Sequence, residues 1–259
     1  MKQIIGPTAP FRGVSLYSGD KARLLSALTS FVQHFHPKTS SFLKIYTPNP
    51  EQMVLARENP AFFHTLLEAD ILLPDGAGLV WAIHRQQGLK SEEAMKVQRI
   101  PGREVFHDLL GISTDKKWKV FLLGGSSGSA KAVLDQWIKK TGDETITWQY
   151  DDGSKENSIQ ALEKIRAYQP DLLFVAYGAP WQELWIERHQ DILEKAEVKI
   201  AMVVGGAFEY ESGKIPSISP LVENLHLEWL QRLILEPWRW RRQLKGVWFF
   251  VEELFSSHS

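Results

Sequence analysis

The chain has 259 residues, of which 44% are hydrophobic and 24% are charged, and it contains no cysteine. This composition is typical of a globular protein with one large or two small domains, and it excludes disulfides, thiolate nucleophiles and cysteine-ligated metals. Thirty Lys and Arg residues against 31 Asp and Glu residues give a formal net charge of −1, so a globally basic nucleic-acid-binding protein is not expected. With no run of about 18 apolar residues and no signal-peptide pattern, we expect neither a transmembrane helix nor a secretory leader.

Short apolar runs alternate with helical stretches along most of the chain. The runs predict strands at Phe42–Tyr46, Ala69–Leu73, Trp118–Leu123, Thr145–Tyr150, Asp171–Tyr177 and Val198–Val204. The intervening stretches predict helices at Asp20–Phe35, Pro60–Glu68, Gly78–Gln87, Ser129–Lys140, Glu156–Tyr168 and Pro180–Leu193. This alternation predicts an α/β fold with a mostly parallel sheet and helices on both faces.

Polar residues follow the first two predicted strands, where an open α/β sheet binds its ligands. Thr47 and Asn49 can place a hydroxyl and an amide at this edge, although the same residues suit a turn and a helix cap equally well. Asp75 follows the second strand, and its carboxylate can serve as a general base or cap the next helix. The residues alone leave these alternatives open.

Two later loops are also candidates for ligand binding. Gly124 and Gly125 begin a glycine-rich loop that can bring backbone N–H groups to a phosphate, although its spacing matches no established phosphate-binding motif and a plain turn is equally consistent. Pro180 suits the first turn of a helix, which places Gln182 and Glu183 near its amino terminus. Gln182 can hydrogen-bond a uracil or a sugar, whereas Glu183 can complement the helix dipole.

The sequence offers no metal site and no dinucleotide fingerprint. The eight histidines match no metal-binding spacing, and no Asp-x-Asp pair stands at a strand end. A dinucleotide-dependent oxidoreductase on such a sheet would need a Gly-x-Gly-x-x-Gly loop, which is missing. We therefore expect neither a bound metal nor a cofactor.

The composition changes at about Leu221, which divides the chain into a core (1–220) and a tail (221–259). Four of the ten tryptophans lie between positions 229 and 248, and five basic residues and one acidic residue lie between positions 232 and 245. Trp240, Leu244 and Trp248 would line one helix face. This pattern is typical of a helix on an anionic membrane surface, and also of a helix that packs its aromatic face on the domain.

Three arginines of the tail have spacings that favour anion binding. Arg232, Arg239 and Arg242 would fall within about 80° of arc on an unbroken helix, where three guanidinium groups can hold a pyrophosphate. Pro237 lies among them and interrupts a regular helix.

Seven motifs occur in order from about Thr47 to about Arg242. They read T-P-N-P-E, L-P-D-G-A-G-L-V, R-I-P-G-R-E, L-L-G-G-S-S-G, G-A-P-W-Q-E, V-G-G-A-F-E-Y-E-S-G and L-E-W-L-Q-R-L-I-L-E-P-W-R-W-R-R. In this order they resemble the WecB/TagA/CpsF family of bacterial glycosyltransferases. The resemblance implies a Rossmann-like core with a helical C-terminal appendage. It also implies inverting, metal-independent transfer of a sugar, often N-acetylmannosamine, from a UDP donor to an undecaprenyl-diphosphate-linked sugar.

The resemblance also implies roles for individual residues. Asp75 matches the proposed catalytic base, because an inverting transfer needs one carboxylate to accept the proton of the acceptor hydroxyl. The remaining matches are Thr47, Asn49, Arg99 and Gln182 around donor or acceptor, and Arg232, Arg239 and Arg242 in a membrane-associated appendage that closes over the active site. The implied location is cytoplasmic, on the inner face of the bacterial plasma membrane, and a homo-oligomer is left open.

The sequence departs from the family pattern at three places. Arg103 and Glu104 stand where many members have a small residue and Asp, and Trp181 replaces a common Lys. Residues 213–220 lack the Arg-Ala-Pro that members commonly carry. A non-catalytic nucleotide-sugar-binding or scaffold protein on the same fold is the alternative function.

Overall fold

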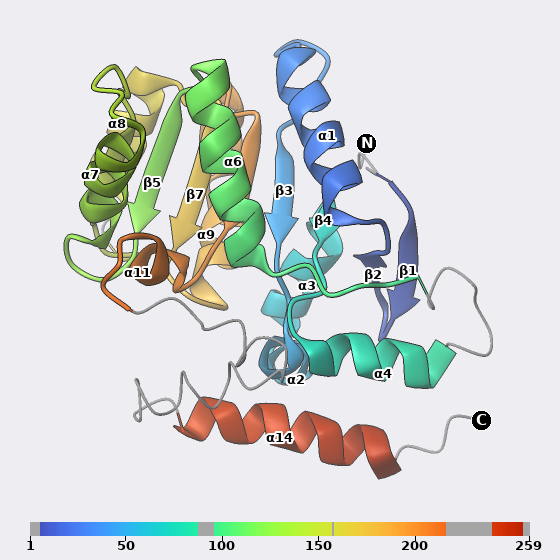
Figure 1. Cartoon of the computed structure of the whole chain (residues 1–259). Coiled ribbons are helices and arrows are strands. Elements are labelled where there is room, and N and C mark those ends of the chain that lie inside the picture. Colours follow the sequence, from blue (N-terminus) through green and yellow to red (C-terminus); the bar gives the residue numbers. More distant parts are fainter. Residues whose placement is uncertain (1–5, 88–95, 157, 216–239, 256–259) are drawn as a thin grey trace.

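A six-stranded parallel sheet forms the centre of the computed structural model, which describes residues 6–87, 96–156, 158–215 and 240–255 (Figure 1). Its strands are β3 (Leu43–Tyr46), β4 (Ile71–Leu72), β5 (Val120–Gly124), β6 (Gln149–Asp151), β7 (Leu172–Ala176) and β8 (Ile200–Val203), in the order β4-β3-β8-β7-β5-β6. All neighbouring pairs are parallel. The predicted α/β fold is therefore confirmed, and each predicted strand overlaps an observed one, although the prediction at Thr145–Tyr150 shares only Gln149 and Tyr150 with β6.

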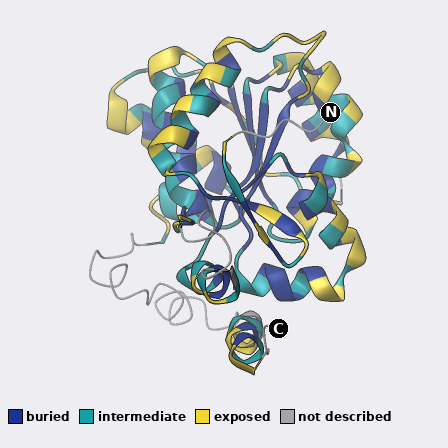
Figure 2. Cartoon of the chain, turned by 90° about the vertical axis from the view of Figure 1, so that its right-hand side faces the viewer, coloured by how far each residue is buried: buried dark blue, intermediate teal, exposed yellow. Residues whose placement is uncertain are grey.

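Both faces of the central part of the sheet are buried, which explains why β5, β7 and β8 are apolar along their whole length. Every residue of β5 and β7 is buried, and successive residues enter opposite cores. Phe121 and Leu123 belong to one core, and Val120 and Leu122 to the other, as the two-residue period of a strand requires. Figure 2 shows the strands dark blue between layers of helices with exposed outer sides.

The helices form two layers and a third group at the carboxyl ends of the strands. One layer contains α1 (Lys21–Gln33), α6 (Gly102–Lys116), α7 (Ser129–Thr141) and α11 (Ala207–Glu211). The other contains α3 (Pro60–Glu68), α8 (Ile159–Tyr168), α9 (Trp181–Arg188) and α10 (Gln190–Lys195). The third group contains α2 (Pro50–Glu58), α4 (Ala77–Gln87) and α14 (Trp240–Phe255). Figure 1 shows α14 crossing beneath α2 and α4, at the edge toward which the strands point.

The amino-terminal hairpin and three helices are not predicted from the sequence. The hairpin pairs β1 (Thr8–Phe11) with β2 (Val14–Tyr17) and turns at Arg12 and Gly13, both of which have positive φ. Helix α2 begins at Pro50 after the Asn49 cap, and its weakly amphipathic sequence buries Gln52 among apolar residues. Helices α6 and α11 are missed as well, and the helix predicted at Pro180–Leu193 is two helices that meet at His189.

The division near residue 220 stays a prediction, since residues 216–239 lie outside the described residues. Among the helices that the structure describes, none is both long and apolar enough to cross a membrane.

Candidate active site

A cavity of about 590 Å³ opens at the carboxyl ends of β3, β4 and β8. The first turns of α2, α6 and α11, the amino-terminal half of α4 and one side of α14 complete its walls. Its polar lining residues are Thr47, Asn49, Glu51, Asp75, Arg99 and Arg103. Four of the residues predicted from the sequence (Thr47, Asn49, Asp75 and Arg99) are thus brought together from three separate loops.

Asp75 occupies a half-buried position in this cavity, in the loop after β4. Its backbone N–H donates to the Pro48 carbonyl at 3.0 Å, which joins this loop to the one after β3. Its carboxylate Oδ2 accepts a hydrogen bond from the N–H of Gly102, the first residue of α6, at 3.3 Å. The positive end of the α6 dipole stabilises a negative charge at this point. Asp75 therefore presents its carboxylate to the cavity beside the amino terminus of α6.

Thr47 and Asn49 both line the cavity and also have structural roles. Asn49 caps α2, because its Oδ1 accepts from the Gln52 N–H at 2.9 Å, so the helix-cap interpretation and the cavity position both hold. Thr47 is buried, and its methyl group packs against Gly102, where an added Cβ would lie 2.6 Å from Thr47 Cγ2. Because Gly102 has no side chain, α6 can begin in direct contact with Thr47, next to the polar residues that line the cavity.

Two arginines supply positive charge to the cavity. Arg99 precedes α6 and Arg103 lies in its first turn, and both line the cavity. Glu104, the next residue, is instead held by Lys21, whose Nζ donates to its Oε2 at 2.8 Å and lies 3.2 Å from Asp108. Burial alone would lower the pKa of Lys21, but these two carboxylates outweigh it and raise the pKa. The neighbouring residues Arg103 and Glu104 thus have different positions. Arg103 lines the cavity, whereas Glu104 contacts Lys21 between α1 and α6.

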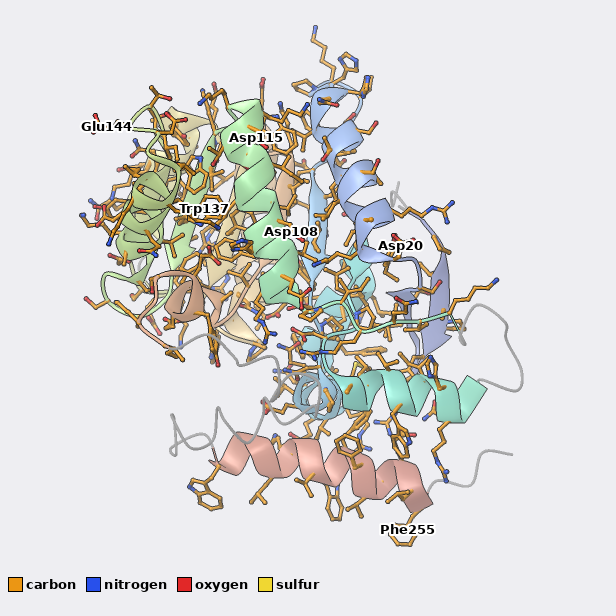
Figure 3. All side chains as sticks on the ribbon, in the orientation of Figure 1. Asp20, Asp108, Asp115, Trp137, Glu144 and Phe255 are labelled. Carbon is orange, nitrogen blue, oxygen red and sulfur yellow. The ribbon has the colours of Figure 1, made fainter. Side chains whose placement is uncertain are left out.

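The helix α11 is fixed to its neighbours by Glu211. The Trp137 indole N–H of α7 donates to Glu211 Oε1 at 2.8 Å, and His107 Nδ1 of α6 lies 2.9 Å from the same oxygen. Figure 3 labels Trp137 beside α6 and α7. Since α11 contributes Ala207 and Tyr210 to the cavity lining, this contact sets one side of the cavity.

The glycine-rich loop after β5 does not line the described cavity. Gly124 and Gly125 both have φ of +84°, and a Cβ at Gly124 would lie 2.7 Å from the Tyr177 ring. The N–H of Ser126 donates to Glu209 Oε1 at 2.9 Å. The Glu209 carboxylate therefore accepts from one backbone donor of the loop, and phosphate binding at Gly124 and Gly125 stays a prediction beside the plain turn.

Gln182 has a different position from the one expected. Its side chain is 1% exposed, and its Oε1 accepts from the N–H groups of Gly178 and Gly205, each at 3.1 Å. Its Nε2 donates to Glu183 Oε1 at 3.0 Å, and Glu183 is itself buried. Gln182 is therefore absent from the described cavity lining and joins the loops after β7 and β8, and its contact with a uracil or a sugar stays a prediction.

The arginines of the tail are described only in part. Arg232 and Arg239 lie outside the described residues, and Arg242 belongs to α14. In the part of the chain that the structure describes, no group of three His, Cys, Asp or Glu residues is placed to hold a metal ion.

Comparison with known proteins agrees with this geometry. The chain matches the model of the Glycosyl transferase WecG/TagA/CpsF family over residues 11–258. The chain belongs to this family. The predicted family is thus confirmed, and the protein is a glycosyltransferase.

Three similar proteins carry the name N-acetylglucosaminyldiphosphoundecaprenol N-acetyl-beta-D-mannosaminyltransferase. The one from Bacillus subtilis (strain 168) is 32% identical over 85% of this chain and 83% of its own length. The one from Bacillus spizizenii is 34% identical over 85% of this chain and 82% of its own length. The one from Staphylococcus aureus (strain MRSA252) is 29% identical over 91% of this chain and 88% of its own length.

In this glycosyltransferase, α14 is docked by a buried carboxylate that the sequence analysis did not single out. Glu253 is fully buried and forms an ion pair with Arg12 of the amino-terminal hairpin. The Gln86 amide donates to both carboxylate oxygens, at 2.7 and 3.0 Å, and Arg85 Nε donates to the Glu253 carbonyl at 3.1 Å. One turn before, buried Phe249 packs with its ring 4.8 Å from the Arg12 guanidinium. No local sequence pattern indicates the ion pair, because Arg12 and Glu253 lie about 240 positions apart in the chain.

Glu253→Gln should release α14, because it leaves the Arg12 guanidinium, whose side chain is only 17% exposed, without the anion of this pair. Breaking a buried ion pair costs about 3–5 kcal/mol. We expect faster amide hydrogen exchange along α14, measured by mass spectrometry, while the exchange of β5 and β7 stays slow.

Glu252→Gln is the matched control on the same helix. Glu252 pairs with Arg57 at 2.8 Å, but half of the Arg57 side chain is exposed, so this pair contributes about 0–1 kcal/mol. If the amides of α14 exchanged at the wild-type rate in both variants, the Glu253 ion pair would not be the contact that docks α14.

Proposed function

We propose that this glycosyltransferase moves N-acetylmannosamine or a related sugar from a UDP donor to a sugar linked to undecaprenyl diphosphate. The names of the three similar proteins support this acceptor and this sugar, and the family supports the UDP donor. The observation that carries the proposal is the polar wall of the cavity, where the Asp75 carboxylate lies together with Arg99 and Arg103. A general base and cations in one cavity are what a sugar transfer from a nucleoside diphosphate requires.

Asp75 is the general base of the proposed mechanism. The acceptor hydroxyl attacks the anomeric carbon of the donor sugar, its proton passes to the Asp75 carboxylate, and the bond from that carbon to the UDP oxygen breaks. This single displacement inverts the anomeric centre. The hydrogen bond from the Gly102 N–H favours the ionised carboxylate before the reaction and orients it toward the cavity.

The departing UDP gains negative charge on its diphosphate. Arg99 and Arg103 are the described cavity cations that can stabilise this charge, and guanidinium groups match phosphate oxygens in geometry. Thr47 and Asn49 offer a hydroxyl and an amide for the sugars in the same cavity. The roles of Arg232, Arg239 and Arg242 in this step remain predictions from the family.

The outer face of α14 supports a location on the membrane surface. Its exposed apolar residues are Trp240, Leu244, Val247, Trp248, Leu254 and Phe255. Figure 3 shows Phe255 projecting from the helix away from the domain, and its side chain is 84% exposed. An amphipathic helix of this kind lies in the interface of a bilayer with its apolar face inward. We place the enzyme on the cytoplasmic face of the bacterial plasma membrane, where α14 would meet the lipid-linked acceptor.

Asp75→Asn should lose most turnover and keep donor binding, because an amide cannot accept the proton. General-base catalysis accounts for about 10²–10⁴-fold in rate. Release of UDP with a lipid-linked acceptor measures turnover, and titration calorimetry with UDP measures donor binding. Asp108→Asn, on the outer side of α6, is the control and should remain active. Near-normal turnover of a folded Asp75→Asn would rule out this base. Absence of UDP release from the wild-type protein would favour the alternative of a non-catalytic nucleotide-sugar-binding protein.

Turnover should survive an excess of EDTA, because the arginines take the place of a divalent cation at the diphosphate. The measurement is the initial rate of UDP release before and after chelation. Loss of activity that Mg²⁺ or Mn²⁺ restores would contradict the proposed diphosphate chemistry.

Leu244→Glu combined with Trp248→Glu should release the enzyme from anionic vesicles, because two charges then interrupt the apolar face of α14. Co-sedimentation with vesicles of phosphatidylglycerol and phosphatidylethanolamine measures binding. Ile159→Glu is the control, since Ile159 is 70% exposed but lies on α8. Equal sedimentation of all three proteins would exclude α14 as the membrane contact, and a change in oligomeric state would assign the face to a second copy.

A further inference from the structure

The cavity has two walls of opposite character, and the proposed reaction at Asp75 uses only one of them. The polar wall comes from the loops after β3 and β4 and from the start of α6. The opposite wall is apolar and is made by Trp81 of α4 with Val247, Phe250, Val251 and Leu254 of α14. Asp75 and the two arginines of the polar wall account for a sugar hydroxyl and a diphosphate, which leaves the apolar wall for an apolar part of a substrate.

Two aromatic rings form the centre of the apolar wall. The ring centroids of Trp81 and Phe250 are 5.7 Å apart, and the side chains are 37% and 38% exposed. Gly78 makes room for this arrangement, since an added Cβ would lie 2.1 Å from the Phe250 ring. The Arg85 guanidinium lies 5.8 Å from the Trp81 ring and also donates to the Leu254 carbonyl at 3.2 Å. Contacts of Gly78 and Arg85, both of α4, therefore hold the Trp81 and Phe250 side chains in place.

The apolar wall continues without a break to the outer face of α14. At about 100° per residue, Val247, Val251 and Leu254 fall between Phe250 and the outward Leu244 and Trp248. Val247 and Leu254 line the cavity and are also more than half exposed, so they belong to both surfaces. A hydrocarbon chain can thus leave the cavity along α14 and stay on apolar side chains as far as the surface of the protein.

We propose that the Trp81–Phe250 wall binds the isoprene units next to the diphosphate of the lipid-linked acceptor. This inference rests on the proposed function and names the part of the acceptor that the apolar wall recognises. The acceptor carries a sugar hydroxyl, a diphosphate and a polyprenyl chain in succession. The cavity offers the Asp75 carboxylate for the hydroxyl and an apolar wall for the polyprenyl chain, which match the two ends of the acceptor in chemistry. The wall therefore makes the enzyme prefer a prenyl ester over a short one, even in the absence of a bilayer.

Two soluble acceptors of the full-length enzyme test this preference. Both are N-acetylglucosaminyl diphosphates, one esterified with farnesyl and the other with methyl, and they are used without vesicles below the micelle concentration of the farnesyl ester. The readout is the ratio of kcat/KM for the farnesyl ester to kcat/KM for the methyl ester. In the wild type we expect a ratio well above one. In Trp81→Ala and Phe250→Ala it should fall roughly 10-fold or more, with the methyl ester turned over at the wild-type rate.

Further variants separate the wall from the outer face and from the fold. Trp248→Ala removes an equally large aromatic side chain from the same helix outside the cavity, and it should keep the wild-type ratio. Gly78→Ala retains every aromatic residue but displaces the Phe250 ring, so it should lower the ratio in a protein with an unchanged circular dichroism spectrum. Equal losses with both esters, or an unchanged ratio in the wall variants, would overturn the proposal.

A binding experiment tests the wall independently of turnover. Titration calorimetry compares farnesyl diphosphate with inorganic diphosphate on the wild type and on Phe250→Ala. The wild type should bind farnesyl diphosphate more tightly, and the variant should lose this preference while its affinity for inorganic diphosphate is kept. Equal affinities for the two ligands in the wild type would refute the apolar subsite. A clear preference without any sugar transfer would instead contradict the proposed function and leave the subsite standing.

Discussion

The buried carboxylate of Glu253 is the interaction on which the shape of the active site depends. Burying a charge is costly unless it is paired and hydrogen-bonded, and Arg12 and Gln86 meet both conditions. Together with the buried ring of Phe249, these contacts hold α14 in its register on the domain. That register turns Phe250 toward the cavity and leaves Trp248 on the outside. The ion pair between the hairpin and α14 thus contributes to deciding which side chains of the helix face the cavity.

The parallel sheet provides the second half of the site. All six strands end at one edge, so loops from distant parts of the sequence meet there. Helix α6 begins at this edge and brings three groups at once, namely the Gly102 N–H for Asp75, the positive end of its dipole and the Arg103 guanidinium. The sheet thereby organises the polar chemistry, and α14 adds the apolar surface that the sheet cannot supply.

The sequence predicts the sheet and part of the polar wall because both depend on local patterns. Apolar runs mark the buried strands, and the loops after two of them contain Thr47, Asn49 and Asp75. The position of Gln182 is not predictable in this way, since its partners are backbone groups of Gly178 and Gly205 in two different loops. The hairpin around Arg12 escapes prediction for a related reason. Its short strands form a separate two-stranded sheet. The hairpin holds α14 through the ion pair of Arg12 with Glu253, and a contact between such distant residues leaves no periodic pattern in the sequence.

The distance in sequence between Arg12 and Glu253 also sets when the cavity can be completed during synthesis of the chain. A ribosome adds about 5–20 residues per second, so on the order of tens of seconds separate the emergence of these two partners. During that interval the sheet and the polar wall can form, while the cavity still lacks the apolar side chains of α14 and the ion pair of Arg12 with Glu253. A nascent chain therefore cannot complete the cavity before its last described helix has emerged and docked.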